Sequence, residues 1–294
     1  MTFYDEMVSA PEIPMAVRLR LAHGALQALA DHADVRVLHV KGVAWDPALT
    51  RGRRPSTDCD LLVDPAGVEA MVDALEGASW QRMTTFEHGS VFAHAATYYH
   101  PVWGTVDLHR WFPGLHRDPA ASFEALWSER VLVEHGGRPI AVPSLIGQRL
   151  IMLVHAARTG RHEASGDVER AWHSASDDER MAVEALARRL DAVVPLAIAT
   201  GREDDVIGLP QARLWTALHE HENSTAVWFA RLRDARGVRE HVAVLWSAMH
   251  VNPDHLALRL GRAPTRVDLA RDWVGRLGRA GRRVLGSSIG RLRG

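Results

Sequence analysis

Residues 54–64 read RPSTDCDLLVD, and this stretch decides the fold of the first half of the chain. Residues 58–63 have the length and the apolar, β-branched composition of a strand. Because strand side chains alternate between faces, Asp58 and Asp60 share one face, and Cys59, Leu61 and Val63 share the other. Two carboxylates on one side of an apolar strand repel each other and bury poorly, so the pattern indicates a cationic partner.

A third carboxylate occurs in VDLH at 106–109, where Asp107 and His109 share a face opposite the two flanking apolar residues. If this strand pairs with residues 58–63, three carboxylates converge. Oxygen ligands of this kind select a hard cation, Mg²⁺ or Mn²⁺, and such a cluster suits metal-assisted nucleotidyl transfer. Two other readings stay open: Asp58 caps a turn, or Asp107 lies exposed on an edge strand.

The surrounding pattern predicts an α+β protein. Residues 14–33 have helical periodicity and 35–40 are β-branched, and further on we expect a short helix over 65–77 and β-like segments over 80–86, 90–99 and 105–112. This order predicts a mixed sheet with flanking helices in a domain of residues 1–142. Beyond Pro143 the periodicity is helical over 145–157, 167–199, 211–236 and 238–250, which predicts an all-helical domain of residues 143–294.

Composition bounds the function classes. The 294 residues are 47% hydrophobic and 24% charged with a net charge of -1, which excludes a wholly disordered chain and gives no overall argument for nucleic acid or membrane. The single cysteine, Cys59, excludes an intramolecular disulfide and a cysteine-based zinc site. The first fifteen residues lack the basic start of a signal peptide, and the chain has no apolar run long enough to span a membrane, so we expect a cytoplasmic protein.

Three motifs together resemble a known family. They are HVKG at 39–42, RPxxDxDLLV at 54–63 and VDLH at 106–109, with a weaker similarity in LIMLVHAAR at 150–158. In this combination the chain resembles a bacterial family of uncharacterised nucleotidyltransferases within the polymerase-β-like nucleotidyltransferase superfamily. The resemblance implies that superfamily's mixed sheet and its chemistry, and it is strongest over residues 35–112.

The resemblance also implies roles for individual residues. Asp58 and Asp60 match the paired metal-binding aspartates, and Asp107 matches the third. Lys41 and Gly42 stand where the wider superfamily usually has the Gly-Ser turn that holds the triphosphate. Glycine lets the backbone approach phosphates and lysine supplies a positive charge for them. Lys41 is also the only lysine in an otherwise arginine-based chain.

Two further positions carry more open roles. Arg54 matches an arginine before the first aspartate and would bind phosphate or order the loop; it is equally a solvated charge in an arginine-rich segment. His109 is a candidate for the acceptor site, or else a half-buried strand histidine. The family commonly places tryptophan directly after this histidine, whereas here Arg110 precedes Trp111.

The sequence therefore predicts a Mg²⁺- or Mn²⁺-dependent nucleotidyltransferase that binds a nucleoside triphosphate such as ATP, transfers its nucleoside monophosphate and releases pyrophosphate. The acceptor stays open among peptide, protein, RNA, sugar and small molecule. One alternative is a glycosyltransferase whose D-x-D motif binds a metal and a nucleotide-sugar. Another is a module that keeps this fold and binds nucleotide without turnover.

The C-terminal segment has a charge of its own. Residues 256–294 contain ten arginines and two aspartates, while the rest of the chain is acidic. An apolar stripe runs along it at helical spacing: Val267, Ala270, Val274, Leu277 and Val284. The stripe predicts a basic amphipathic helix that contacts a partner or a membrane surface, or that packs against the acidic body.

Overall fold

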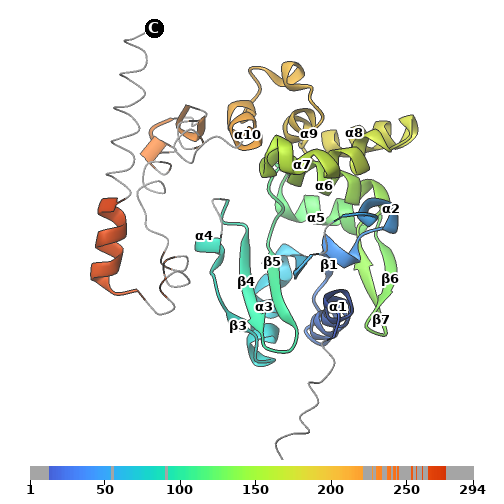
Figure 1. The fold of residues 1–294 in the computed structure, drawn as a ribbon, viewed down its shortest axis with the longest axis vertical. Coiled ribbons are helices and arrows are strands. Elements are labelled where there is room, and N and C mark those ends of the chain that lie inside the picture. Colours follow the sequence, from blue (N-terminus) through green and yellow to red (C-terminus); the bar gives the residue numbers. More distant parts are fainter. Residues whose placement is uncertain are drawn as a thin grey trace, which may run out of the picture.

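A five-stranded mixed sheet forms the first half of the protein in the computed structural model, which describes residues 13–53, 56–89, 92–220, separate positions between 227 and 260, and 264–275. The strand order is β1-β2-β5-β4-β3 (Figure 1). Strands β2 and β5 are parallel and the other neighbours are antiparallel. The strands are β1 (Val37–Val40), β2 (Asp58–Val63), β3 (Gln81–Arg82), β4 (Ala95–His100) and β5 (Gly104–His109).

One face of the sheet is covered by helices α1 (Met15–His32) and α3 (Val68–Gly77). The apolar side of β2, which includes Cys59, Leu61 and Val63, packs here against the buried stripe of α1. The alternation expected over residues 58–63 is thus confirmed, because these three side chains enter this core while Leu62, in phase with Asp60, enters the core on the opposite face.

The opposite face of β1 and β2 packs against the helical second half of the chain (Figure 1). Leu38 and Leu62 join a core built by five helices: α5 (Pro119–Trp127), α6 (Leu145–Thr159), α8 (Asp177–Arg189), α9 (Val193–Ala199) and α10 (Ala212–His219). This core crosses the expected boundary at residue 142 without a break. The division into two domains there stays a prediction.

A hairpin that the periodicity did not indicate lies between the sheet and the helices. Strands β6 (Val131–His135) and β7 (Arg138–Val142) are joined at Gly136 and Gly137 and pack beside α1 and β1. The remaining short elements are η1 (Gly42–Ala44), α2 (Pro47–Thr50), η2 (Pro65–Gly67), α4 (Phe86–Gly89), α7 (Arg161–Val168), η3 (Glu169–His173) and η4 (Glu203–Val206).

Two expected elements are wrong in their extent. The strand expected over 80–86 pairs only at Gln81 and Arg82, and α4 begins at Phe86. The single helix expected over 167–199 is interrupted by a π-helical turn, η3, and restarts at α8. The restart has a local cause, because the Ser176 hydroxyl and the Glu179 carboxylate cap each other's backbone N–H groups.

A buried chain of histidines connects α1 to the sheet. The Gln27 amide donates to Asp31, so its oxygen faces His39 Nε2, which donates to it across 3.0 Å. His39 Nδ1 then accepts from His23 Nδ1 at 2.7 Å, and His23 Nε2 is left buried without a partner among the described residues. This arrangement requires a neutral His39, because its Nδ1 accepts, and burial favours a neutral His23 as well.

We expect this pair to make the protein acid-labile. Burial lowers the pKa of His23 to about 4 from 6.5, and burial holds the pKa of His39 well below 6.5. Unfolding therefore takes up protons below pH 6.5, and the stabilisation is complete above that pH and is lost as the pH falls towards 4. For His23 alone this amounts to about 3 kcal/mol.

The measurement is chemical denaturation between pH 8 and pH 4.5 for the wild type, His23→Asn and His32→Asn. Asparagine keeps a hydrogen-bond donor near the Nδ1 position but cannot be protonated, so His23→Asn is expected to flatten the pH dependence. His32 is exposed on the same helix, and its variant should follow the wild type. Parallel curves for all three proteins would contradict the assignment.

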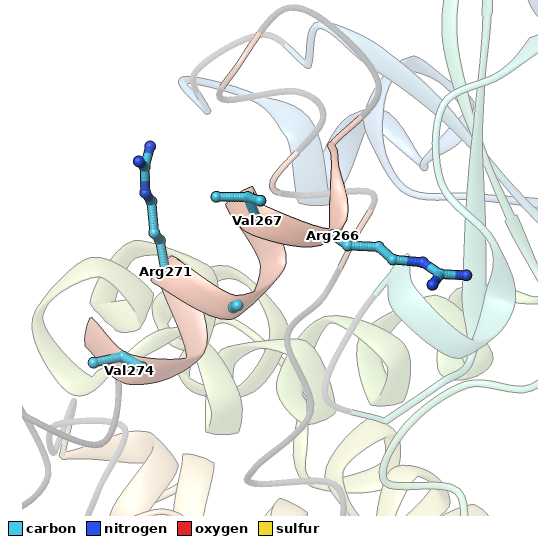
Figure 2. A pocket seen from close by; sticks show the side chains of 5 residues that line it. Arg266, Val267, Arg271 and Val274 are labelled. Atoms are coloured by element: carbon cyan, nitrogen blue, oxygen red, sulfur yellow. The ribbon is translucent and has the colours of Figure 1, made fainter.

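The described part of the C-terminal segment contains a helix over residues 266–275. Its apolar positions Val267, Ala270 and Val274 are exposed and, with Arg266 and Arg271, line a shallow surface pocket (Figure 2). Leu277 and Val284 lie outside the described residues, and a partner or membrane contact through this segment stays a prediction. Among the described helices, none has both the length and the apolar character needed to cross a membrane.

Candidate functional site

Two carboxylates face each other at the centre of the sheet. Asp60 on β2 is directly opposite Asp107 on the parallel strand β5, and both point towards the helical half because their apolar neighbours enter the other core. Asp60 is buried and Asp107 is half-buried. With His109 they form a compact group whose potential ligand atoms lie within 4.8 Å of one another. Of the three carboxylates expected to converge, Asp60 and Asp107 do so.

Lys41 contributes a cation to this group. It follows β1 with φ 67° and ψ 175°, a backbone conformation that residues other than glycine rarely adopt. Its ammonium lies 2.5 Å from Asp60 Oδ1. Gly42 follows with φ +61°, and a Cβ there would lie 3.0 Å from Ser56 Cβ. The turn therefore needs glycine both for its backbone conformation and for close approach to the segment that leads into β2.

The charge of Asp60 is held by its neighbours. Burial alone would raise the pKa of this carboxyl, but the Lys41 ammonium and a hydrogen bond from His109 hold it below its usual range. His109 Nε2 lies 2.7 Å from the same Oδ1, whereas its Nδ1 is buried with no partner among the described residues. Burial lowers the pKa of His109, so the neutral ring with its proton on Nε2, donating to Asp60, fits these contacts.

Asp107 lies in a more strained electrostatic position. Burial and the neighbouring charge of Asp60 raise the pKa of the Asp107 carboxyl. The only hydrogen bond described for this carboxylate is 2.6 Å long, from Thr97 Oγ1 on β4. Two carboxylates whose oxygens lie within 4.8 Å, one of them with a raised pKa, repel each other, and a divalent cation between them would relieve that repulsion.

Asp58 lies on the same face but outside the compact group. Its partner across the sheet is Thr105, and its carboxylate accepts a 2.7 Å hydrogen bond from Ser56 Oγ. It is half-buried at the start of β2, beside Asp60 along the strand. Among the described residues the group within ligand distance is thus completed by His109 rather than by Asp58. Arg54 lies outside the described residues.

The segment before β2 is anchored to the helical half. Arg53 forms a bidentate pair with Asp167 of α7 at 2.8 and 3.0 Å and stacks over Trp45. Arg170, in the π-helical turn, donates to the carbonyl of Arg51 at 3.1 Å. These contacts tie residues 51 and 53, which precede the first aspartate in the sequence, to α7 and the π-helical turn.

Sequence reasoning missed three residues that complete the surroundings of the carboxylates. Thr97 holds Asp107, His94 packs on the His109 ring at 5.1 Å, and Arg158 from α6 approaches His94. Arg158 ends the LIMLVHAAR segment, but helical periodicity alone does not show that this helix packs over the sheet. The pairing of β4 with β5 brings Thr97 beside Asp107, and the packing of α6 brings Arg158 to His94.

Comparisons with solved structures give likenesses of low identity. The lincosamide antibiotic adenylyltransferase LnuA, bound to lincomycin, is 14% identical, covering 58% of this chain and 96% of that chain, with a TM-score of 0.33. The antibiotic-resistance factor ANT(2'')-Ia is 16% identical, with coverages of 59% and 94% and a TM-score of 0.40. An antigenic nucleotidyltransferase-like protein from Paracoccidioides brasiliensis is 13% identical, with coverages of 62% and 93% and a TM-score of 0.37.

Comparison with curated protein sequences gave no significant match. A family model does match, and it spans the sheet, the hairpin and the helices up to α9. Its description is "uncharacterised nucleotidyltransferase", it matches residues 16–202, and all the site residues described above lie within that range. This confirms the resemblance drawn from the three motifs: the chain belongs to this family of uncharacterised nucleotidyltransferases.

Proposed function

We propose that this protein transfers a nucleoside monophosphate from a nucleoside triphosphate to an acceptor hydroxyl, with a divalent metal, and releases pyrophosphate. The observation that carries the proposal is the pair Asp60 and Asp107 on parallel neighbouring strands, with the Lys41–Gly42 turn beside it. Membership of the nucleotidyltransferase family supports this reaction over the sugar-nucleotide alternative.

The donor set fits Mg²⁺ or Mn²⁺. Asp60 and Asp107 would hold the ion, and Asp58, outside the compact group but on the same face of β2, would supply a third carboxylate. The Lys41 ammonium at Asp60 shows that this position already accepts a positive charge. A bound divalent ion supplies charge neutralisation for the triphosphate and acidifies a hydroxyl near it.

The chain's own residues divide the remaining work. Lys41 lies on the turn after β1, and its ammonium would move from Asp60 to phosphate oxygens when another cation binds that carboxylate. His109 keeps Asp60 oriented through its Nε2 proton. The role of His109 at the acceptor stays a prediction, since its ring is buried against Asp60.

Asp107 would take the acceptor's proton. Thr97 Oγ1 donates to its Oδ1 and so orients the carboxylate for that role. As the acceptor oxygen bonds to the α-phosphorus, the bond from that phosphorus to the pyrophosphate oxygen breaks. The hydroxyl proton passes to the carboxylate, and pyrophosphate leaves with the electron pair.

The test does not require the acceptor. We expect a non-cleavable α,β-methylene ATP analogue to raise the melting temperature of the wild type in the presence of Mg²⁺ or Mn²⁺, and EDTA to abolish the shift. Asp58→Ala and Asp60→Ala should each lose the metal-dependent part, whereas UDP-glucose should give no shift. Stabilisation by the sugar nucleotide alone would favour the glycosyltransferase reading, and no shift with any nucleotide would contradict the proposal.

Turnover then separates an enzyme from a silent binding module. Pyrophosphate release from ATP, GTP, CTP and UTP is measured with pools of small-molecule, peptide and RNA acceptors. We expect release that depends on acceptor and metal together and that is absent in Asp60→Ala. Nucleotide binding without release under every pool supports the silent module.

A further inference from the structure

Arg158 is a cation near the carboxylates that has no acidic partner among the described residues. It lies in the last turn of α6, partly buried, and its Nη1 is 3.5 Å from His94 Nε2. Its guanidinium carbon also lies 5.8 Å from the centroid of the Phe112 ring. Burial lowers the pKa of Arg158, and the charges of Asp60 and Asp107 oppose that effect without contacting it.

The same helix shows how this chain satisfies an arginine that only stabilises the fold. Arg149, buried two and a half turns earlier, donates to the carbonyls of Arg170 and Ala171 and pairs with Glu179 at 3.2 Å. Arg158 has no such set of acceptors in the described part of the chain. Arginine stays charged even when it is buried. A partly buried guanidinium without an acidic partner therefore destabilises the protein unless an anion binds to it.

The surroundings of Arg158 indicate where that anion would lie. The Lys41 ammonium lies 5.8 Å from the centroid of the same Phe112 ring, so the two cations share one aromatic side chain. That ring in turn lies 5.9 Å from the His109 ring, beside Asp60. The neighbouring His155 has its pKa held well below 6.5 by burial and then by the charges of Lys41 and Arg158. Neutral histidines and two cations therefore border the acidic group.

We propose that Arg158 binds the β- and γ-phosphates of the nucleoside triphosphate, and so the pyrophosphate that leaves. Its guanidinium would donate two N–H groups to non-bridging oxygens, which is the geometry that arginine offers to phosphate. Lys41 would contact the same phosphates from the sheet side, so the triphosphate would be held between β1 and α6. This inference rests on the proposed function, because it assigns a phosphate subsite within the same site.

The test measures binding of inorganic pyrophosphate and of the α,β-methylene ATP analogue, each with Mg²⁺, by titration calorimetry. The proteins are the wild type, Arg158→Met, Arg158→Lys and Arg188→Met; Arg188 is exposed on α8 and serves as the matched control. We expect Arg158→Met to weaken both ligands about 10- to 100-fold, from the loss of charge-assisted hydrogen bonds. Arg158→Lys should recover part of the loss, and Arg188→Met should bind like the wild type.

The melting temperature without ligand distinguishes a phosphate-binding arginine from a purely structural one, because replacing a structural arginine would lower it. Because Arg158→Met removes a charge that lacks an acidic partner, its melting temperature without ligand should equal or exceed that of the wild type. Unchanged pyrophosphate affinity in Arg158→Met, or a lowered melting temperature, overturns the role of Arg158 and leaves the proposed function standing. If the wild type binds neither ligand, the proposed function itself fails.

Discussion

Asp60→Asn is expected to lower the rate of nucleotidyl transfer about 10³-fold or more. The substitution keeps the shape of the side chain but removes the charge that lies opposite Asp107 and would hold the metal. Loss of a carboxylate that carries the metal removes several kcal/mol of charge stabilisation from the transition state. The measurement is pyrophosphate release at saturating triphosphate and metal, with the exposed Asp73→Asn as the matched control.

Asp60→Asn should also destabilise the protein, so its inactivity needs separating from unfolding. Lys41 is left as a largely buried cation without its carboxylate, and breaking such a pair costs about 3–5 kcal/mol. The double variant Lys41→Met/Asp60→Asn removes both charges and should regain much of that stability. We expect the double variant to stay inactive; activity near the wild-type level in either variant would contradict the role of Asp60.

The central part of the site could be predicted because it depends on alternation within two strands. Asp58 and Asp60 on β2, and Asp107 and His109 on β5, are each spaced two residues apart in a short apolar run. The apolar residues between them leave one register in which both strands bury their apolar side. The strand over 58–63 has the expected bounds for that reason. The position of Asp58 relative to the others was not predictable, because the local bond to Ser56 decides it.

The β6–β7 hairpin and the start of α8 have local sequence signals that an analysis of hydrophobic periodicity does not detect. The hairpin β6–β7 has two glycines, Gly136 and Gly137, between two β-branched runs, which is a recognised hairpin signal. The start of α8 has the Ser-x-x-Glu spacing of a capping box at Ser176 and Glu179. Both signals could have been found in the sequence alone.

Arg158 and His94 belong to a different class, because nothing local marks them. They come from α6 and from the segment before β4, and they approach each other only after the helical half packs on the sheet. An apolar helix that ends in arginine has many docking solutions, and the sequence of one chain does not select among them. Such residues need the tertiary structure.

The strained backbone of Lys41 leads to the second large effect. Its φ and ψ of 67° and 175° lie in a region that is almost restricted to glycine and costs other residues about 1–3 kcal/mol. We expect Lys41→Gly and Lys41→Met to lose about 10²- to 10³-fold in transfer rate, since each removes the cation that would contact the triphosphate.

The two variants should differ in stability. A glycine substitution usually destabilises a protein more than a methionine substitution, and here we expect the reverse. Both leave Asp60 without its ammonium partner, but glycine also relieves the backbone strain, whereas methionine retains it. Relief of strain exceeds the entropy that glycine adds to the unfolded chain, about 0.5–1 kcal/mol, so Lys41→Gly should melt above Lys41→Met. Wild-type transfer rates in Lys41→Gly would show that activity needs only the backbone of this turn and not the ammonium.

A higher melting temperature for Lys41→Met would show that Lys41 is not held in a strained conformation. The expected result, low activity in both and higher stability in the glycine variant, would mean that the protein tolerates an unfavourable backbone at this position in order to keep an ammonium beside the carboxylates.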